Sequence, residues 1–275
     1  MHFITPKTIA EALAAKKEFG YPVLAGGTDL LVQWKGVGLP HGGAISLSGI
    51  PELKDIVEEE DRIIIGATAT HADIYDSVVV RQYLPALVAA CRTVGALQIQ
   101  NRGTIGGNVM NASPAGDTLP ALLAYDADVV LAGAGSTRTV NFGKFYSGYR
   151  QTAVSKEEIV TKFIFRKPPQ GERAVFMKVG TRQAQAISKV SGCFRMVVNG
   201  NNEVESVAIA YGSVAPVPIR CPKTEEFLRN AELNGVTIEG AIKLAREEVA
   251  PIDDIRSTGS YRRHVAGVML KRFLI

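Results

Sequence analysis

The alternation of apolar and polar positions predicts a chain that combines short strands with amphipathic helices. Residues 8–19 place apolar side chains on one helical face, and Gly20 then provides a stop signal. Residues 21–25 form a short apolar run that ends in a tight glycine turn, as expected of a strand. The same reasoning predicts these further elements before residue 170: two strands within 55–67, a helix capped by Thr70, a buried helix over 84–94, a short helix over 118–124, and strands over 127–132, 137–142 and 158–166.

One long stretch, residues 102–117 (RGTIGGNVMNASPAGD), follows neither the helical nor the strand period. It carries no charge between its two ends and is rich in small residues. Loops that face water usually carry charged side chains, so the stretch predicts a loop that is covered rather than exposed.

The segment Pro168-Pro169-Gln170-Gly171 is typical of a linker. After it the pattern changes to antiparallel strands and then to helices, which indicates a separate α+β domain. The predicted elements are strands over 174–179, 192–198 and 204–210, a hairpin turn at 199–202, and helices over 224–230, 238–249 and 260–274. The predicted domains are an N-terminal domain over 1–170, with subdomains of about 1–54 and 55–170, and a C-terminal domain over 172–275.

Composition narrows the classes of function. The 275 residues are 46% hydrophobic and 21% charged, as in ordinary globular proteins. A net charge of +4 is too small for a protein that binds nucleic acid by neutralising phosphates, so no nucleic-acid partner is expected. The longest uncharged stretch, residues 36–51, is interrupted by glycines and prolines, and the N-terminus turns polar too soon for a signal peptide. We therefore expect no membrane span.

The side chains that most often carry chemistry are sparse. Cys91, Cys193 and Cys221 are far apart and form no CxxC pair, so neither a disulfide framework nor a metal site is expected, and a cytoplasmic location is predicted. No hydrolytic triad or paired-carboxylate pattern is visible, so no catalytic side chain is singled out. Trp34 is interpreted as a packing residue and His71 as a capping or surface residue.

Glycine is the one compositional excess, with 27 residues in 275. Two Gly-Gly pairs stand beside hydroxyl residues, in AGGTD at 25–29 and in TIGGN at 104–108. A glycine pair can direct successive amide N–H groups into one concavity that holds a phosphate oxygen, and two such nests can clamp a pyrophosphate. Either pair alone can also be an ordinary turn. Neither pair matches GxGxxG or GxxxxGK[ST], so the sequence does not support a Rossmann fingerprint or a P-loop.

Longer motifs carry a resemblance to a known family along nearly the whole chain. These motifs are an F-x-x-P-x-T-x-x-E-A-L opening at 3–13, AGGTDLL at 25–31, TIGGNVMNASPAGD at 104–117, EEIV at 157–160 and FMKVGTRQAQAISKVS at 176–191. With them the chain resembles the flavin-binding medium subunits of the molybdenum hydroxylases, the family that includes xanthine dehydrogenase and carbon monoxide dehydrogenase.

The resemblance implies a fold and a set of cofactor-binding residues. The fold is of the α+β class: a two-part FAD-binding domain like that of vanillyl-alcohol oxidase (PCMH type), followed by a small α+β C-terminal domain with an antiparallel sheet and helices. The family's first clamp on the FAD pyrophosphate corresponds to Leu24, Ala25, Gly26, Gly27, Thr28, Asp29 and Leu30. Its second clamp corresponds to Thr104, Ile105, Gly106, Gly107 and Asn108.

Three further positions match the family's flavin contacts. Asp117 corresponds to an acid on the ribose and adenine side of FAD, although it could also be a helix N-cap. Ile159 corresponds to an apolar backbone contact to the adenine. Lys178 corresponds to a basic residue near the isoalloxazine, although a solvated strand lysine is the plain alternative.

One segment departs from the family. Relatives often carry RRxxDIA after the lysine, whereas residues 181–188 read TRQAQAIS, with Gln185 and Ala186 where acids would stand. That segment approaches the flavin face used by the external acceptor, so the departure bears on which acceptor is served. The cysteine-rich insertion of relatives that reduce aromatic thioesters is absent from the sequence.

The resemblance implies an oxidoreductase, namely the FAD-binding electron-transfer subunit of a heteromeric molybdenum hydroxylase. Electrons would pass from [2Fe–2S] centres on a small partner subunit, through FAD, to NAD⁺ or another acceptor. Molybdopterin would lie on a large partner subunit, since three cysteines cannot ligate clusters that need four ligands each. The alternatives are the FAD subunit of a carbon monoxide or nicotinate-type dehydrogenase, a stand-alone flavoprotein oxidase of the same fold, and a non-enzymatic α/β binding module.

Overall fold

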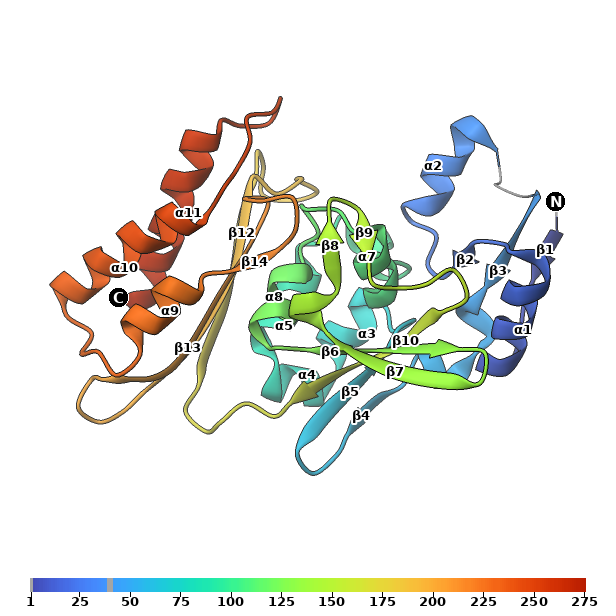
Figure 1. The fold of residues 1–275 in the computed structure, drawn as a ribbon, viewed down its shortest axis with the longest axis horizontal. Helices are drawn as coiled ribbons and strands as arrows, with labels where there is room; N and C mark the ends of the chain where they lie inside the picture. The colour runs from blue at the N-terminus through green and yellow to red at the C-terminus, as the bar shows by residue number, and fades with distance from the viewer. Residues whose placement is uncertain (1, 39–41) are drawn as a thin grey trace.

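The computed structural model describes residues 2–38 and 42–275, and its elements form three successive groups along the longest axis of the molecule (Figure 1). Each group is built on its own sheet, of three, five and four strands in chain order. Antiparallel pairing dominates, and helices pack beside every sheet, so the predicted α+β class is confirmed.

The first group is a small parallel sheet with two helices. Its strands lie in the order β1 (His2–Ile4), β3 (Gly43–Ser46), β2 (Val23–Leu24). Helix α1 (Ile9–Phe19) confirms the predicted helix: the Thr8 hydroxyl accepts the amide of Glu11, and Gly20 closes the helix at φ +63°. Helix α2 (Leu30–Val37), which the periodicity did not indicate, follows the first glycine pair, and short 3₁₀ turns cover Leu47–Gly49 and Pro51–Leu53.

The second group is a five-stranded antiparallel sheet flanked by short helices. Its order is β4 (Ile56–Glu58), β5 (Arg62–Gly66), β10 (Ile159–Arg166), β6 (Asp128–Gly133), β7 (Ser136–Asn141), which confirms the strands expected in these segments. Its helices are α3 (His71–Asp76), α4 (Val78–Tyr83), α5 (Pro85–Arg92), α6 (Leu97–Gln100), α7 (Ile105–Asn111) and α8 (Leu119–Ala124). A 3₁₀ turn (Phe142–Lys144) and a separate ribbon of β8 (Tyr146–Gly148) and β9 (Gln151–Thr152) complete it.

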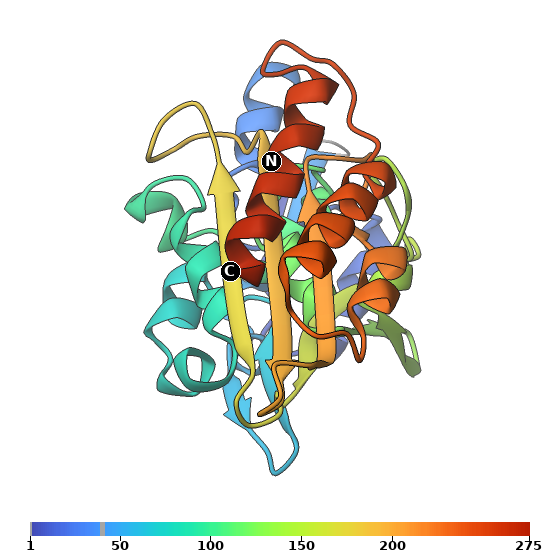
Figure 2. The same ribbon diagram turned by 90° about the vertical axis from the view of Figure 1, so that its left-hand side faces the viewer.

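The third group is a four-stranded antiparallel sheet whose two faces are both covered. The order is β11 (Arg173–Val179), β12 (Val190–Val198), β13 (Val204–Gly212), β14 (Ile219–Arg220). Helices α9 (Pro222–Leu228), α10 (Gly235–Glu248) and α11 (Gly259–Leu274) lie over one face (Figure 2), and α5 and α8 of the second group pack on the other. The predicted strands and helices of this part are confirmed to within a few residues.

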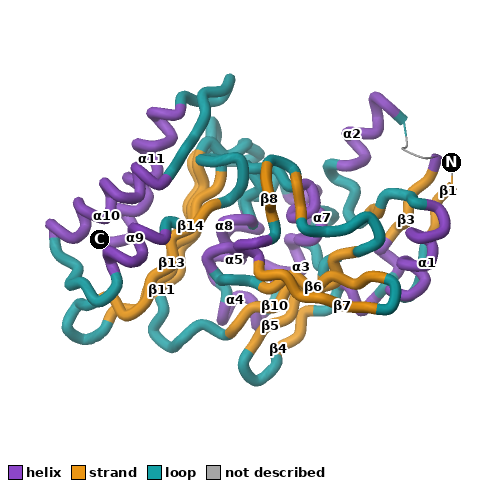
Figure 3. Tube along the Cα trace, in the orientation of Figure 1, coloured by secondary structure: helices purple, strands orange, loops and turns teal. Residues whose placement is uncertain are grey.

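Alternation along β12 explains how one sheet serves two cores. Cys193 belongs to the hydrophobic cluster shared with the second group, whereas its neighbour Phe194 belongs to the cluster beneath α10 and α11. Successive strand residues point to opposite faces, so the third group is joined to the second by a continuous apolar core. The connection between β10 and β11 is a loop (Figure 3). No helix within the described residues is long and apolar enough to cross a membrane.

Candidate functional site

The two segments that carry the glycine pairs pack against each other. A Cβ placed on Gly26 would lie 2.7 Å from the carbonyl carbon of Arg102 and 3.0 Å from the Cα of Gly103, and it would overlap the Arg102 carbonyl oxygen. A Cβ on Gly103 would in turn lie 3.2 Å from the Thr28 hydroxyl. Glycine is therefore required at position 26 for close approach, and the structure brings the two predicted segments together.

The first glycine pair leaves its amides free. Gly27 adopts a φ of +72°, which turns the chain between β2 and α2. Among the described residues, none accepts a hydrogen bond from the amide N–H groups of residues 26–29. Residue 29 is exposed, and residues 26–28 are half-buried. A run of free amides at a glycine with positive φ is the backbone geometry from which anion-binding nests are built.

The second glycine pair does not have that geometry, and the expectation of a second amide nest is wrong. Residues 105–111 form helix α7 rather than a loop, with Thr104 as its N-cap. The amide of Ile105 donates to Ala69 O (3.0 Å), that of Gly106 to Ala67 O (2.9 Å), and that of Gly107 to the Thr104 hydroxyl (3.0 Å). The protein itself uses these donors, so they are not available to a phosphate.

The glycines of the second pair serve close packing instead. A Cβ on Gly106 would lie 2.6 Å from the carbonyl oxygen of Ala67, so α7 could not sit this close to the end of β5 with a larger residue. Gly107 faces the other way: a Cβ there would meet only the Thr104 hydroxyl, at 2.9 Å, and the residue is exposed. The surface at Gly107 is therefore open for a ligand to approach.

Asp117 and Lys178 form a buried ion pair between the second and third groups. Lys178 Nζ lies 2.5 Å from Asp117 Oδ2 and 3.0 Å from the carbonyl oxygen of Thr93, and the Ser188 hydroxyl donates to Asp117 Oδ1 at 2.6 Å. The two charged side chains are 7% and 11% exposed. Burial raises the pKa of Asp117 above its ordinary value, and the Lys178 ammonium opposes that rise.

This arrangement corrects two interpretations made from the sequence. Asp117 does not cap α8: the N-cap is Thr118, without a side-chain cap bond, and the Asp117 carboxylate is directed to Lys178 and Ser188. Lys178 is not a solvated strand lysine, because its ammonium is enclosed.

A polar bridge links the ion pair to α7. The Thr118 hydroxyl donates to Asn108 Oδ1 at 2.6 Å, and a Cβ on Gly116 would lie 3.2 Å from the same oxygen. Asn108 belongs to the predicted second clamp, and Thr118 directly follows Asp117 in the chain. Hydrogen bonds through the buried Thr118 therefore connect the Asp117–Lys178 pair to α7.

A cavity of about 280 Å³ opens between the first and second groups. It is lined by Ala25, Gly26, Ser48, Gly49, Ile50, Pro51, Lys54, Thr68, Thr70, Asn101, Arg102 and Thr104. Pockets for small molecules usually measure roughly 300–1,000 Å³, so this cavity lies at the lower end of that range. A larger depression of about 480 Å³ lies between α10 and α11, but charged side chains line most of it and no predicted site residue borders it.

Ile159 does not line this cavity. It begins β10, is 3% exposed, and belongs to the same apolar cluster as Ile50, which lines the cavity. The backbone contact that the resemblance implies for Ile159 stays a prediction.

Several site residues were not singled out from the sequence. Arg102 and Gly103 hold the first glycine segment, and Thr93 and Ser188 hold the ion pair. The one available signal was Ser188, which stands where the family pattern has alanine.

His71 was interpreted wrongly: it is 1% exposed, its Nδ1 has no hydrogen-bond partner among the described residues, and burial lowers its pKa to about 4.

The cysteines and the possible metal ligands are dispersed in the part of the chain that the structure describes. In the parts of the chain that the structure describes, no three His, Cys, Asp or Glu side chains lie close enough to share a metal ion. All three cysteines are free and buried, and burial raises the pKa of Cys193 to about 12, which keeps the thiol protonated.

Sequence comparison matches both parts of the chain to known families. A family described as the FAD binding domain in molybdopterin dehydrogenase matches residues 1–167, and one described as the CO dehydrogenase flavoprotein C-terminal domain matches residues 175–275. The FAD subunit of nicotinate dehydrogenase from Eubacterium barkeri is 31% identical over 99% of this chain and 94% of its own length. The FAD-binding subunit of xanthine dehydrogenase from Escherichia coli O157:H7 is 30% identical over 92% and 87%.

A solved structure agrees with these matches. The carbon monoxide dehydrogenase of Hydrogenophaga pseudoflava has a chain that superposes with a TM-score of 0.94 at 28% identity, covering 99% of this chain and 95% of that one. Quinoline 2-oxidoreductase from Pseudomonas putida 86 shares the fold, with a TM-score of 0.92 at 20% identity. The expected PCMH-type FAD-binding fold with a small α+β C-terminal part is thereby confirmed.

Proposed function

The chain belongs to the FAD-binding subunits of the molybdenum hydroxylases, and we propose that it relays electrons from [2Fe–2S] centres on a small partner subunit, through FAD, to NAD⁺ or another acceptor. The substrate would be oxidised on a large molybdopterin-binding partner. Bound FAD would supply the exchange between one-electron and two-electron transfer, while the protein supplies binding and orientation. The family membership argues against a non-enzymatic binding module.

The observation that carries the proposal is the set of free amides at residues 26–29. Four backbone donors without acceptors among the described residues lie beside a cavity, on a segment whose glycine at position 26 packs closely against Arg102. Such a nest is suited to the FAD pyrophosphate and needs no cationic side chain. The residues present therefore fit the cofactor, with one amide nest rather than two.

The remaining predicted residues acquire distinct roles. We place the pyrophosphate between the free amides of 26–29 and the open surface at Gly107. The cavity beside Gly26 would receive the adenosine end, with Ile159 in the apolar cluster that includes the cavity residue Ile50. The Asp117–Lys178 pair would border the dinucleotide between its two ends, with Asp117 on the ribose and adenine side and Lys178 toward the isoalloxazine, as the resemblance implies. There the Asp117 carboxylate can accept a hydrogen bond from a hydroxyl group of the cofactor, and the Lys178 ammonium can stabilise negative charge on it.

Residues 181–188 differ from the common family pattern, and this difference bears on which external electron acceptor the flavin serves. Arg182 donates two hydrogen bonds to the carbonyl oxygen of Gln185, at 2.6 and 3.2 Å, and Gln185 adopts a φ of +53°. The two acids of the common pattern are missing, so this face has less negative charge to repel an anionic acceptor such as NAD⁺. The relatives at 31% and 30% identity belong to different dehydrogenases, and we leave the substrate to the molybdenum-bearing chain.

The test is to purify the protein from its native host under mild conditions and identify the accompanying chains, the flavin and the acceptor. We expect one FAD per chain, together with a large molybdenum-containing chain and a small iron–sulfur chain. We also expect the complex in the cytoplasmic fraction, because free cysteines favour a reducing compartment. Reduction of NAD⁺ is then compared with reduction of an artificial dye. Absence of flavin would refute the proposal, and substrate oxidation by the isolated chain would favour a stand-alone oxidase.

A further inference from the structure

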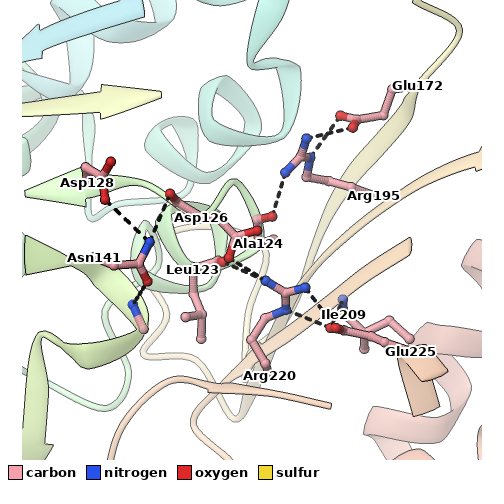
Figure 4. Close-up of polar contacts among 11 residues, drawn as sticks. Leu123, Ala124, Asp126, Asp128, Asn141, Glu172, Arg195, Ile209, Arg220 and Glu225 are labelled. Atoms are coloured by element: carbon pink, nitrogen blue, oxygen red, sulfur yellow. Dashed lines mark hydrogen bonds and ion pairs between the residues drawn. The ribbon is translucent and has the colours of Figure 1, made fainter. Parts of the chain in front are cut away.

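Two arginines of the third group reach across to the C-terminal end of α8 (Figure 4). Arg195 on β12 donates from Nη1 to the carbonyl oxygen of Ala124 at 2.6 Å. Arg220 on β14 donates from Nη1 to the carbonyl oxygen of Leu123 at 3.3 Å and to Asp126 Oδ1 at 2.8 Å. Both carbonyls belong to the last turn of α8, where a helix lacks internal donors and favours cations.

The two arginines are held in the same way. Glu172 accepts from Nε and Nη2 of Arg195, at 2.9 and 2.6 Å, and Glu225 accepts from Nε and Nη2 of Arg220, at 2.6 and 2.8 Å. Each fork uses one edge of the guanidinium and leaves Nη1 directed toward α8 (Figure 4). Glu225 is itself fixed by the amide of Ile209, at 2.8 Å. The direction in which each arginine reaches is therefore set within the third group.

Arg195 is the more enclosed of the two. Its side chain is 14% exposed, that of Glu172 is 7% exposed, and its guanidinium lies 4.3 Å from the centre of the Tyr125 ring. Within the described residues, the carbonyl oxygen of Ala124 receives a hydrogen bond only from Arg195. Removing Arg195 would leave both this carbonyl and the Glu172 carboxylate without their partner.

Helix α8 joins these arginines to the Asp117–Lys178 pair. It begins two residues after Asp117, and all six of its residues are buried. Lys178 and Arg195 lie on neighbouring strands of one sheet, in pairs four residues apart: Lys178 pairs with Ser191, and Ala174 pairs with Arg195. Four residues span about 13 Å of strand. Helix α8 and the two residues before it cover a comparable length, about 1.5 Å per residue for the helical part.

Side chains of one sheet therefore contact both ends of the α8 segment, Lys178 at Asp117 and the two arginines at the last turn. We infer that Arg195 and Arg220 are positioning residues for the flavin site: they hold the C-terminal end of α8 against the sheet and thereby hold Asp117 against Lys178. The inference rests on the proposed function, because it takes the Asp117–Lys178 pair as part of the FAD site. Neither arginine touches that pair, so both act only through α8.

The test measures FAD affinity in the protein as purified with its accompanying chains, after flavin removal and titration with FAD. We expect Arg195→Met with Arg220→Met to raise the dissociation constant at least tenfold. Arg229→Met is the matched control, since Arg229 also pairs with a glutamate, Glu226, but at an exposed site on the third group. Its dissociation constant should match that of the wild type.

A milder variant and a second background separate positioning from loss of folding. Arg195→Lys keeps the charge but loses the fork, and we expect a rise of about threefold with an unchanged circular dichroism spectrum. In a Lys178→Met background the double arginine change should cost less than threefold, because the contact through which it acts is already gone. A tenfold cost in that background, or wild-type affinity in Arg195→Lys, would overturn the positioning role.

The same titration separates this inference from the proposed function. Failure of the wild-type protein to bind FAD would overturn the proposed function and the inference together. Wild-type binding with no loss in the double arginine variant would overturn only the inference.

Discussion

Replacement of Gly26 by alanine probes the contact between the two glycine segments most directly. The added Cβ would lie 2.7 Å from the carbonyl carbon of Arg102, whereas ordinary contact begins at 3.4 Å, so the segments must separate by about 0.7 Å for that atom alone. The overlap with the carbonyl oxygen is worse, and both neighbours are backbone atoms that cannot rotate away. Such overpacking typically costs about 1–3 kcal/mol.

The cost is measured as a change in melting temperature and in flavin content. In a chain of this size about 1 kcal/mol lowers Tm by roughly 2–4 °C, so we expect Gly26→Ala to lower Tm by roughly 2–12 °C. The free amides of 26–29 would move with the segment, so the purified variant should retain far less FAD. Thermal unfolding followed by circular dichroism, with and without added FAD, measures both effects.

Gly36→Ala is the matched control. Gly36 lies inside α2, where an added Cβ meets nothing within 4 Å. Alanine in a helix interior is more stable than glycine by roughly 0.5–1 kcal/mol. Its Tm should be unchanged or slightly raised, with full flavin content. If Gly26→Ala had the Tm and flavin content of Gly36→Ala, the close approach at Arg102 would not matter and the reasoning would be refuted.

Three further predictions follow from single residues. Gly107→Val places a side chain on the open surface where we put the pyrophosphate; it should abolish FAD retention and leave the far-ultraviolet circular dichroism unchanged, and normal flavin content would remove Gly107 from the site. Burial lowers the pKa of His71 from its ordinary value of 6.5 to about 4, so the free energy of unfolding should fall by at most about 3 kcal/mol as pH drops from 6.5 toward 4. Chemical denaturation at each pH should show no such dependence in His71→Gln, and a parallel loss in both proteins would contradict the prediction. Arg138 lowers the pKa of Glu158 to about 2, so the stability that this carboxylate contributes is present above pH 4.5 and lost as pH falls toward 2. The Tm of Glu158→Gln should lie below that of the wild type at pH 6 and converge with it near pH 2. A constant difference in Tm would count against the ion pair.

Much of the fold followed from the sequence because its signals are local. Thr8 and Gly20 bound α1 as predicted, Thr70 forms a capping box with Asp73, and the alternation in 158–166 became β10. Helix α2 and the parallel pairing of β1 with β3 were missed, because the helix is short and the pairing joins residues some forty positions apart. Tertiary contacts decide such elements, and no local pattern reports them.

The candidate site divides in the same way. Its glycine segments and its charged pair could be named from the sequence, since Gly26, Gly107, Asp117 and Lys178 stand in motifs. What each does could not be read there, because two Gly-Gly pairs with similar neighbours in sequence differ in backbone conformation and in where the backbone acceptors lie. Ala67 supplies an acceptor to the second pair, and no described residue supplies one to the amides of the first.

The sequence by itself determined the local elements, the family resemblance and the candidate residues, since these depend on propensity, capping and motif spacing. Only the tertiary structure decided which amides stay free, that Asp117 pairs with Lys178, that His71 is buried, and that Arg195 crosses to α8. The physical reason is that hydrogen-bond satisfaction and burial depend on partners brought from elsewhere in the chain.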